Sequence, residues 1–441
     1  MNGKNFNKKS RANATRTVLT GPVSGVAAWG VEAGRPQDLF SPSELRRGIT
    51  FTGFFWMLAI AAVLGHRAYA PLLLVPLAVI DWRHAYFARR ATFRRLDRAW
   101  LLYFANAFLF CFFTLVSAAW SPLPNRADWA FRMAVCFMLA PISYHAVSYL
   151  TPVAKTRAAA GVAWASVAML VLLLFEAATN ARIRQLLPPE EDVVRDVIAL
   201  GRGTLLLVLL VWPARRILAI QMKRPLVGLA LIALTLIPAV KFTILTNAVM
   251  LMAGAFGILL AWIFQNRAVT LIFAAALALV WATPLAAIIM PLESLVAMGT
   301  EWELPASWIQ RFYIWERAGN EVLANPLGGG VGYARYLSYA REMVPVYGVP
   351  LGTMPVHPHN LFLHVWLDLG VVGAISLSGI IVAGYAGARR AVATGGGAVI
   401  CAIIASLLVT AMTEWSVWQV WRFAAVWIAL IAWRLSSPSV H

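Results

Sequence analysis

Two histidines, His357 and His359, are the residues of this chain best suited to acid–base chemistry. They lie in the run His357-Pro358-His359-Asn360, directly before a long apolar segment. The start of a helix presents free N–H groups and partial positive charge, which disfavour a protonated imidazole. A neutral imidazole can accept a proton, so His359 is a candidate general base. Asn360 is a residue type that caps helix starts, and a capping role alone would also explain it.

Arginines and one lysine could complement the histidines by binding an anion. Arg311 lies on the polar side of a predicted amphipathic helix, and Arg202 begins an apolar segment. The planar guanidinium suits phosphate oxygens and stays charged in a low dielectric. There are alternatives to anion binding. Arg311 could be a solvated surface residue, and Arg202 and Lys241 could snorkel to the membrane surface. Arg422, within a tryptophan-rich stretch, lies deeper than an interfacial anchor requires.

Motifs for metal or nucleotide chemistry are missing from the sequence. Cys111, Cys136 and Cys401 all lie in apolar segments, and no two of them have metal-binding or redox spacing. We find no His-Glu-x-x-His motif, no Asp-x-Asp pair and no Gly-Lys-Ser/Thr phosphate loop. We therefore predict that the chain uses neither a metal nor a cofactor.

The composition indicates an all-α integral membrane protein. Hydrophobic residues make up 61% of the 441 residues and charged residues 13%, whereas soluble proteins average about 25% charged residues. The apolar segments are long and continuous, which favours helices over strands. The net charge of +18 arises largely from basic residues in alternate loops, as the positive-inside rule requires. Membrane topology thus accounts for the positive net charge. We expect the chain to contact membrane lipids and not to bind nucleic acid.

Twelve membrane spans fit the sequence, and we predict one polytopic domain over residues 1–441. Residues 1–48 would form a basic cytoplasmic tail without a cleavable signal peptide. An even number of spans then places both termini in the cytoplasm. The spans are expected near residues 49–66, 69–83, 99–120, 128–150, 158–178, 201–217, 225–240, 244–264, 268–289, 360–386, 395–412 and 416–434.

Residues 290–360, between the ninth and tenth spans, form a long polar loop that we predict to be periplasmic and to carry the active site. Pro305-Ala306-Ser307 predicts a helix start, and Asn325-Pro326 predicts its end. A second short helix is expected over residues 333–343. Both helices are amphipathic and too short to span a membrane, so we expect them to cover the membrane face of the protein.

The ordered motifs of this region resemble those of the O-antigen ligase family, within the wider O-antigen ligase and polymerase group. The resemblance extends over about 65 residues, and the late position of the long loop agrees with it. The motifs that carry it are Arg311-x-x-x-Trp315, Asn325-Pro326-Leu327-Gly328-x-Gly330, His359-Asn360-x-x-Leu363 and Leu369-Gly370-x-x-Gly373.

The resemblance implies an inverting, metal-independent glycosyltransferase of the GT-C type in the bacterial inner membrane. Such enzymes transfer O-antigen polysaccharide from undecaprenyl pyrophosphate to a sugar hydroxyl of lipid A–core at the periplasmic face. It assigns the essential histidine to His359, and the arginines that bind pyrophosphate to Arg311 and Arg202. Relatives often carry another arginine where this chain has Asn247, and Lys241 is our candidate to replace it.

Four residues are expected to support this site or to contact the acceptor: His357, Asn360, Trp315 and Arg422. An O-antigen polymerase or a protein O-oligosaccharyltransferase would share the donor and the His-Asn motif, and would differ in the acceptor. A transporter or flippase is a further alternative, which would predict internal repeats and broken or charged helices in mid-membrane.

Overall fold

The computed structural model describes residues 42–80, 97–124, 127–186, 193–242, 244–392 and 395–437. Most of the predicted tail, residues 1–48, lies outside this set. Eight helices of the described residues are long and apolar enough to cross a membrane, which confirms the all-α membrane fold. They are α1 (Pro42–Leu64), α4 (Arg98–Ser117), α5 (Ala127–Ala146), α6 (Pro152–Thr179), α7 (Val193–Arg216), α9 (Thr246–Phe264), α10 (Asn266–Ile289) and α14 (Leu361–Val392).

Three shorter helices occupy other predicted spans: α8 (Pro225–Lys241), α15 (Gly397–Thr413) and α16 (Val420–Ser436). The segment predicted as the second span differs from the expectation. Its described part consists of short pieces, η2 (His66–Ala68), α2 (Tyr69–Leu72) and η3 (Val75–Val79). Pro71 and Pro76 lack the N–H that a continuous helix would need, which explains the interruption.

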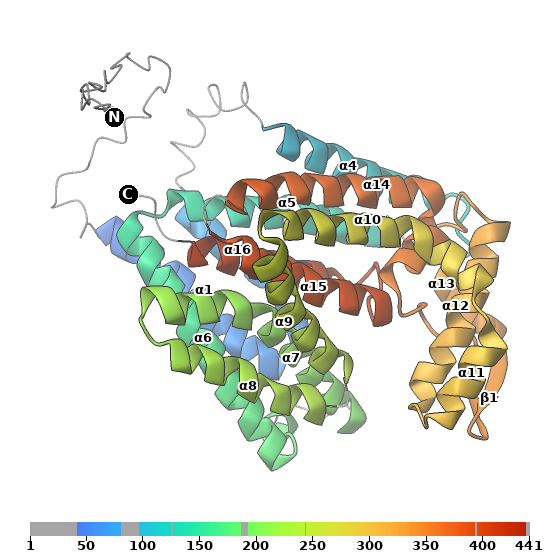
Figure 1. The fold of residues 1–441 in the computed structure, drawn as a ribbon. Coiled ribbons are helices and arrows are strands. Elements are labelled where there is room, and N and C mark those ends of the chain that lie inside the picture. Colours follow the sequence, from blue (N-terminus) through green and yellow to red (C-terminus); the bar gives the residue numbers. More distant parts are fainter. Residues whose placement is uncertain are drawn as a thin grey trace, which may run out of the picture. The chain divides into compact units, whose positions relative to one another are not determined.

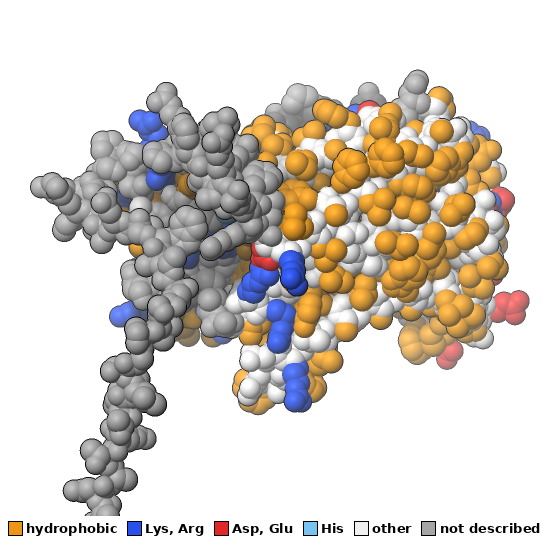
Figure 2. All heavy atoms as spheres, turned by 90° about the horizontal axis from the view of Figure 1, so that it is seen from above, with side chains coloured by type: hydrophobic (Ala, Val, Ile, Leu, Met, Phe, Trp, Pro, Cys, Tyr) orange, Lys and Arg blue, Asp and Glu red, His pale blue; other side chains and the backbone are white. Residues whose placement is uncertain are grey.

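Six helices, α1, α6, α8, α9, α15 and α16, pack against α7, whose central residues, from Leu205 to Val211, are almost completely buried. A helix that is apolar on every side belongs in the interior of a bundle. In Figure 1, α14 runs beside α4 and α10, and α15 packs against α9. Figure 2 shows a face covered largely by hydrophobic side chains. Exposed Phe131 and Trp262, with 71% and 78% of their surfaces accessible, fit contact with lipid.

The long polar loop folds into a small α/β elaboration (Figure 1). It contains α11 (Leu292–Glu301), α12 (Ala306–Ala324), α13 (Tyr333–Leu337), η8 (Ser338–Ala340), and the antiparallel strands β1 (Met343–Val346) and β2 (Val349–Gly352). The predicted start and end of α12 are confirmed. The second predicted helix stops earlier than expected, because a hairpin follows it. Tyr347 and Gly348 form its two-residue turn with positive φ angles of 51° and 76°.

A glycine-rich turn docks this elaboration onto a kink in α14. Gly370 has φ 55° and ψ −150° within the helix, and a Cβ there would lie 2.2 Å from the carbonyl carbon of Leu327. The N–H groups of Gly329 and Gly330 donate to the carbonyls of Leu367 and Asp368, at 2.9 and 3.1 Å. These bonds satisfy carbonyls in the last turn before the kink, and they fix the loop relative to α14.

Candidate active site

The His-Pro-His-Asn run forms the entry to α14 and is held from two sides. The side-chain oxygen of Asn360 accepts hydrogen bonds from the N–H groups of Phe362 and Leu363, at 3.0 and 3.1 Å. Asn360 is therefore the N-cap of α14. From α12, the indole N–H of Trp315 donates to the carbonyl of Pro358, at 3.1 Å. The backbone that carries the two histidines is thus tied to both α12 and α14.

The two imidazoles lie against each other, with ring centroids 4.3 Å apart. His359 has a left-handed backbone, φ 53°, and its N–H donates to Nδ1 of His357 at 3.1 Å. His357 stacks in turn on His364, at 6.1 Å and 10° between the rings. His357 therefore accepts the N–H of His359 through an unprotonated Nδ1. This bond helps to orient His359.

Burial keeps both histidines neutral. It lowers the pKa of His357 well below the ordinary value, with added repulsion from His359, His364 and two arginines. Burial and then the positive charge of Arg311 lower the pKa of His359 to about 4. The Nδ1 atom of His359 is buried without a hydrogen-bond partner in the structure. A buried unpaired nitrogen on a neutral imidazole can accept a proton or a hydrogen bond.

Arg311 reaches this site from α12 and contacts the end of α15. Its Nε donates to the carbonyl of Thr413, at 3.1 Å. The carboxylate of Glu414, the next residue, interacts with both Arg311 and His359. Burial lowers the pKa of Arg311, and Glu414 opposes that effect. Three residues from separate segments, His359, Arg311 and Glu414, therefore share one electrostatic environment.

Arg422 is paired with the same carboxylate, because its Nη2 lies 2.9 Å from Oε2 of Glu414. It also donates to the hydroxyl of Thr410 and lies 4.8 Å from the ring of Trp421. With 5% of its surface accessible, Arg422 requires such a partner, since a buried unpaired charge is very costly. The Glu414–Arg422 pair joins the ends of α15 and α16 beneath the histidines.

Arg202 approaches from α7. Its Nη1 lies 3.2 Å from Nε2 of His66, and its guanidinium is 6.0 Å from the ring of Trp421. The charge of Arg202 also acts on His357. Arg202 thus belongs to the same cluster, next to a buried histidine that the sequence reasoning did not select.

Lys241 is the predicted site residue that the structure does not join to this cluster. It is the exposed last residue of α8 and has no hydrogen bond or ion pair with the described residues. Asn247, at the position where the resemblance implies an arginine, is fully buried and donates to the carbonyl of Gly201 at 2.7 Å. The carbonyl oxygen of Phe242 would lie 3.1 Å from a Cβ at Gly201. The backbone next to Lys241 therefore packs beside Arg202, while the lysine side chain makes no polar contact there.

Asp368 and His364 form a buried polar layer below the histidine pair. Asp368 accepts hydrogen bonds from the N–H groups of Gly332 and Ala334, at 2.8 and 2.9 Å, and from the indole of Trp418, at 2.7 Å. Nε2 of His364 lies 3.5 Å from the same carboxylate. This layer fixes the ring on which His357 stacks.

Sequence reasoning missed three members of the cluster: His66, Asp368 and Glu414. A signal existed for two of them. Asp368 and His364 are one helical turn apart in a predicted span, and ionisable residues at membrane depth are often functional. Glu414 stands between two predicted spans, eight residues before Arg422. Among the described residues, no three His, Cys, Asp or Glu side chains are grouped to hold a metal ion.

Comparison with known proteins supports the earlier resemblance. Residues 242–378, which include Arg311 and the histidine pair, match the family model described as O-Antigen ligase. A protein of Rickettsia conorii provisionally named polysaccharide ligase is 24% identical over 133 residues, 30% of this chain and 32% of its own length. A Rickettsia felis protein with the same provisional name is 23% identical over 133 residues, 30% of this chain and 33% of its own.

The aligned segment spans about a third of the length of these relatives. Arg202, Glu414 and Arg422 lie outside the segment that matches the family model. The family match and the Rickettsia relatives together show that residues 242–378 are similar to the O-antigen ligase family.

Proposed function

We propose that the protein transfers O-antigen polysaccharide from undecaprenyl pyrophosphate to a sugar hydroxyl of lipid A–core, at the periplasmic face of the bacterial inner membrane. The observation that carries the proposal is the contact between α12 and the histidine run, where Trp315, one turn after Arg311, donates to the carbonyl of Pro358 and the charge of Arg311 acts on His359. A fixed cation for a departing pyrophosphate and a neutral base for an acceptor hydroxyl are the two elements that this transfer needs.

In this mechanism, His359 removes the proton of the acceptor hydroxyl. The acceptor oxygen forms a bond to the anomeric carbon from the face opposite the leaving group, so the configuration inverts. The anomeric carbon–oxygen bond breaks, and undecaprenyl pyrophosphate departs with the electron pair. Arg311 and Arg202 stabilise the charge on that leaving group, and no metal is required. The proton on His359 returns to solvent after transfer.

The remaining residues position these groups. His357 accepts the backbone N–H of His359, and Trp315 and Asn360 hold the intervening backbone. Arg422 anchors Glu414, whose carboxylate acts on both His359 and Arg311. Lys241 remains our proposed third contact for the pyrophosphate, and it would have to turn toward Arg202 when the donor binds.

The test uses the purified full-length protein with undecaprenyl-pyrophosphate-linked glycan and lipid A–core. His359→Ala is expected to lower the transfer rate by about two to four orders of magnitude, the usual contribution of a general base. Arg311→Gln should lower it strongly as well. The matched control is Arg341→Gln, which removes an exposed arginine of the same elaboration and should leave transfer unchanged. Wild-type rates in His359→Ala would refute the proposed base.

The acceptor is tested separately, in a deletion strain. Loss of every O-antigen-capped lipopolysaccharide band supports lipid A–core as the acceptor. Lipopolysaccharide that carries core plus a single repeat would indicate a polymerase, and unchanged lipopolysaccharide with altered glycoproteins would indicate transfer to protein.

A further inference from the structure

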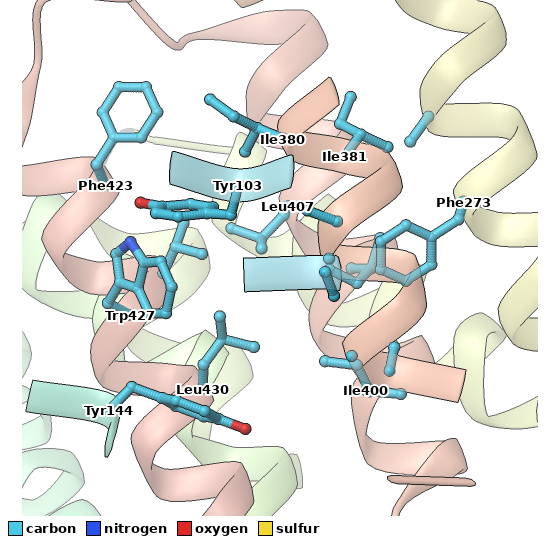
Figure 3. Close-up of a pocket in the computed structure, with 18 of the residues that line it drawn as sticks. Tyr103, Tyr144, Phe273, Ile380, Ile381, Ile400, Leu407, Phe423, Trp427 and Leu430 are labelled. Carbon is cyan, nitrogen blue, oxygen red and sulfur yellow. The ribbon is translucent and has the colours of Figure 1, made fainter. Parts of the chain in front are cut away.

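A large cavity lies within the helix bundle, lined mainly by α4, α5, α14, α15 and α16 (Figure 3). Its volume is about 810 Å³. Lining residues of α14 lie in its first turns, at Leu361, Phe362 and Val365, and again from Leu377 to Arg390, near its end. Both ends of α14, on either side of the kink at Gly370, therefore line the cavity.

The cavity walls are apolar and aromatic along most of this length. In Figure 3, Tyr103, Trp427 and Leu430 face Phe273 and Ile400 across the space. Protein interiors are normally packed with few voids larger than a water molecule. A space of several hundred Å³ with such walls is typical of a site for an apolar ligand. Its dimensions and lining suit hydrocarbon chains.

Among the described residues, the basic side chains that line the cavity lie at the end of α14 that is remote from His359. Arg390 forms an ion pair with Asp97 there, with Nη2 and Oδ1 2.5 Å apart. This pair links the end of α14 to the start of α4 and neutralises the acidic residue of the lining. At the opposite end, Leu361, Trp415 and Val417 line the cavity.

Arg434 and Lys155 are the other two cations at this end of the cavity. Neither forms an ion pair with a carboxylate of the described residues. Arg434 donates to the carbonyl of Tyr144 at 3.1 Å and to the hydroxyl of Ser148 at 2.7 Å, and both acceptors are uncharged. The side chain of Lys155 has no hydrogen bond or ion pair with the part of the chain that the structure describes. The two cations lie close enough to repel each other. An anion between them would relieve that repulsion.

We propose that this cavity binds a glycerophospholipid with an anionic headgroup. Its acyl chains would fill the apolar space, and its phosphate would lie between Lys155 and Arg434. Apolar walls suit acyl chains, and two cations without a carboxylate partner suit a phosphate group. A lipid with an anionic headgroup offers both. The cations lie at the opposite end of the bundle from Arg311, so the site is distinct from the proposed pyrophosphate site and does not depend on the proposed transfer reaction.

A lipid in this position contacts several helices at once. The lining comes mainly from α4, α5, α10, α14, α15 and α16. A ligand that binds only the folded state raises its stability, by an amount that grows with the logarithm of ligand concentration above the Kd. The bound lipid should therefore stabilise the elements that carry His359 and Glu414.

The test is a titration of delipidated, detergent-purified full-length protein with phosphatidylglycerol and with phosphatidylcholine of identical acyl chains. Binding is measured by native mass spectrometry and by the melting temperature. Phosphatidylglycerol should bind more tightly. Lys155→Gln and Arg434→Gln should each weaken its binding about fivefold, the usual effect of one basic residue at an anionic lipid surface. Binding of phosphatidylcholine, whose phosphate is offset by the choline cation, should weaken less than that of phosphatidylglycerol in both variants.

The matched control is Arg267→Gln. Arg267 is exposed and does not line the cavity. It lies near the same end of α14, because Arg389 donates to the carbonyl of its neighbour Asn266, at 3.1 Å. This variant should bind phosphatidylglycerol like the wild type. An equal loss in all three variants would show a general charge effect and overturn the proposal.

Gly384→Leu tests whether the chains enter the cavity. An added Cβ at this lining position would meet only Phe273, at 3.4 Å, and leucine favours helix more than glycine does. The variant should fold and should bind both lipids less tightly. Unchanged binding of both lipids in Gly384→Leu, or equal binding of the two lipids to the wild type, would overturn the proposal. Displacement of phosphatidylglycerol by undecaprenyl phosphate at lower concentration would assign the cavity to the polyprenyl donor instead.

Discussion

The pH dependence of glycan transfer tests the role of His359 directly. Burial, followed by the positive charge of Arg311, lowers the pKa of His359 to about 4, whereas an unperturbed imidazole has a pKa of about 6.5. A general base acts in its neutral form, so activity is lost as the pH falls through its pKa. The environment of His359 therefore lowers the pH below which activity is lost, which we call the acidic limit.

The size of this effect follows from the two pKa values. At about pH 5.5, an ordinary histidine is about nine-tenths protonated, whereas a histidine with a pKa of about 4 is more than about 95% neutral. We expect kcat/KM to fall by less than about 10% between about pH 7.5 and 5.5, where an ordinary histidine gives about a tenfold loss. The assay measures initial transfer rates with purified donor and acceptor at low donor concentration.

Substitution of Arg311 should move the acidic limit in a known direction. Arg311→Gln removes a charge that repels the imidazolium, so the pKa of His359 rises toward its ordinary value. The remaining activity of this variant should decline at a higher pH than that of the wild type. Arg311→Lys keeps the charge and should keep the wild-type limit. A wild-type limit near pH 6.5, unchanged in Arg311→Gln, would refute the reasoning.

Four further perturbations have outcomes that follow from the structure. Asn360→Ala should lower the free energy of unfolding by about 1 kcal/mol through loss of the N-cap, with Asn360→Asp close to the wild type in thermal melts. Asp368→Ala leaves two backbone donors and one indole donor without their acceptor, so a loss of at least about 3 kcal/mol is expected in the same melts. Gly370→Ala should disrupt the docked turn and reduce transfer, because its Cβ would meet the Leu327 backbone. EDTA should leave transfer rates unchanged, and strong inhibition would contradict charge stabilisation by Arg311.

Local rules in the sequence were sufficient for the elements that carry the site. Apolar length identified the membrane helices, and Pro305 and Asn325 correctly bounded α12. The capping preference of asparagine placed Asn360 at the start of α14. The hairpin after Ala340 also had a local signal, because Tyr347-Gly348 separates two valine-rich segments. Our helix prediction for residues 333–343 did not use it.

Contacts between distant segments were beyond the reach of those rules. Arg311 meets Thr413 about a hundred residues along the chain, and Glu414 enters the site through that contact. Asp368 was missed because its partners lie in distant segments, at Gly332 in a glycine-rich turn and at Trp418 between α15 and α16. Charge pairs between helix ends depend on tertiary packing, and neither residue type nor spacing specifies them.

The site couples the basicity of His359 to the charge of its surroundings. Arg311, which the proposed mechanism assigns to the pyrophosphate, is also the cation that most disfavours protonation of His359. An anion bound at Arg311 would offset that repulsion and raise the pKa of the imidazole. Glu414 already acts in the same direction, and its ion pair with Arg422 limits the effect. His359 would thus remain unprotonated in the free enzyme and become a stronger base once the donor is bound, when proton removal is productive.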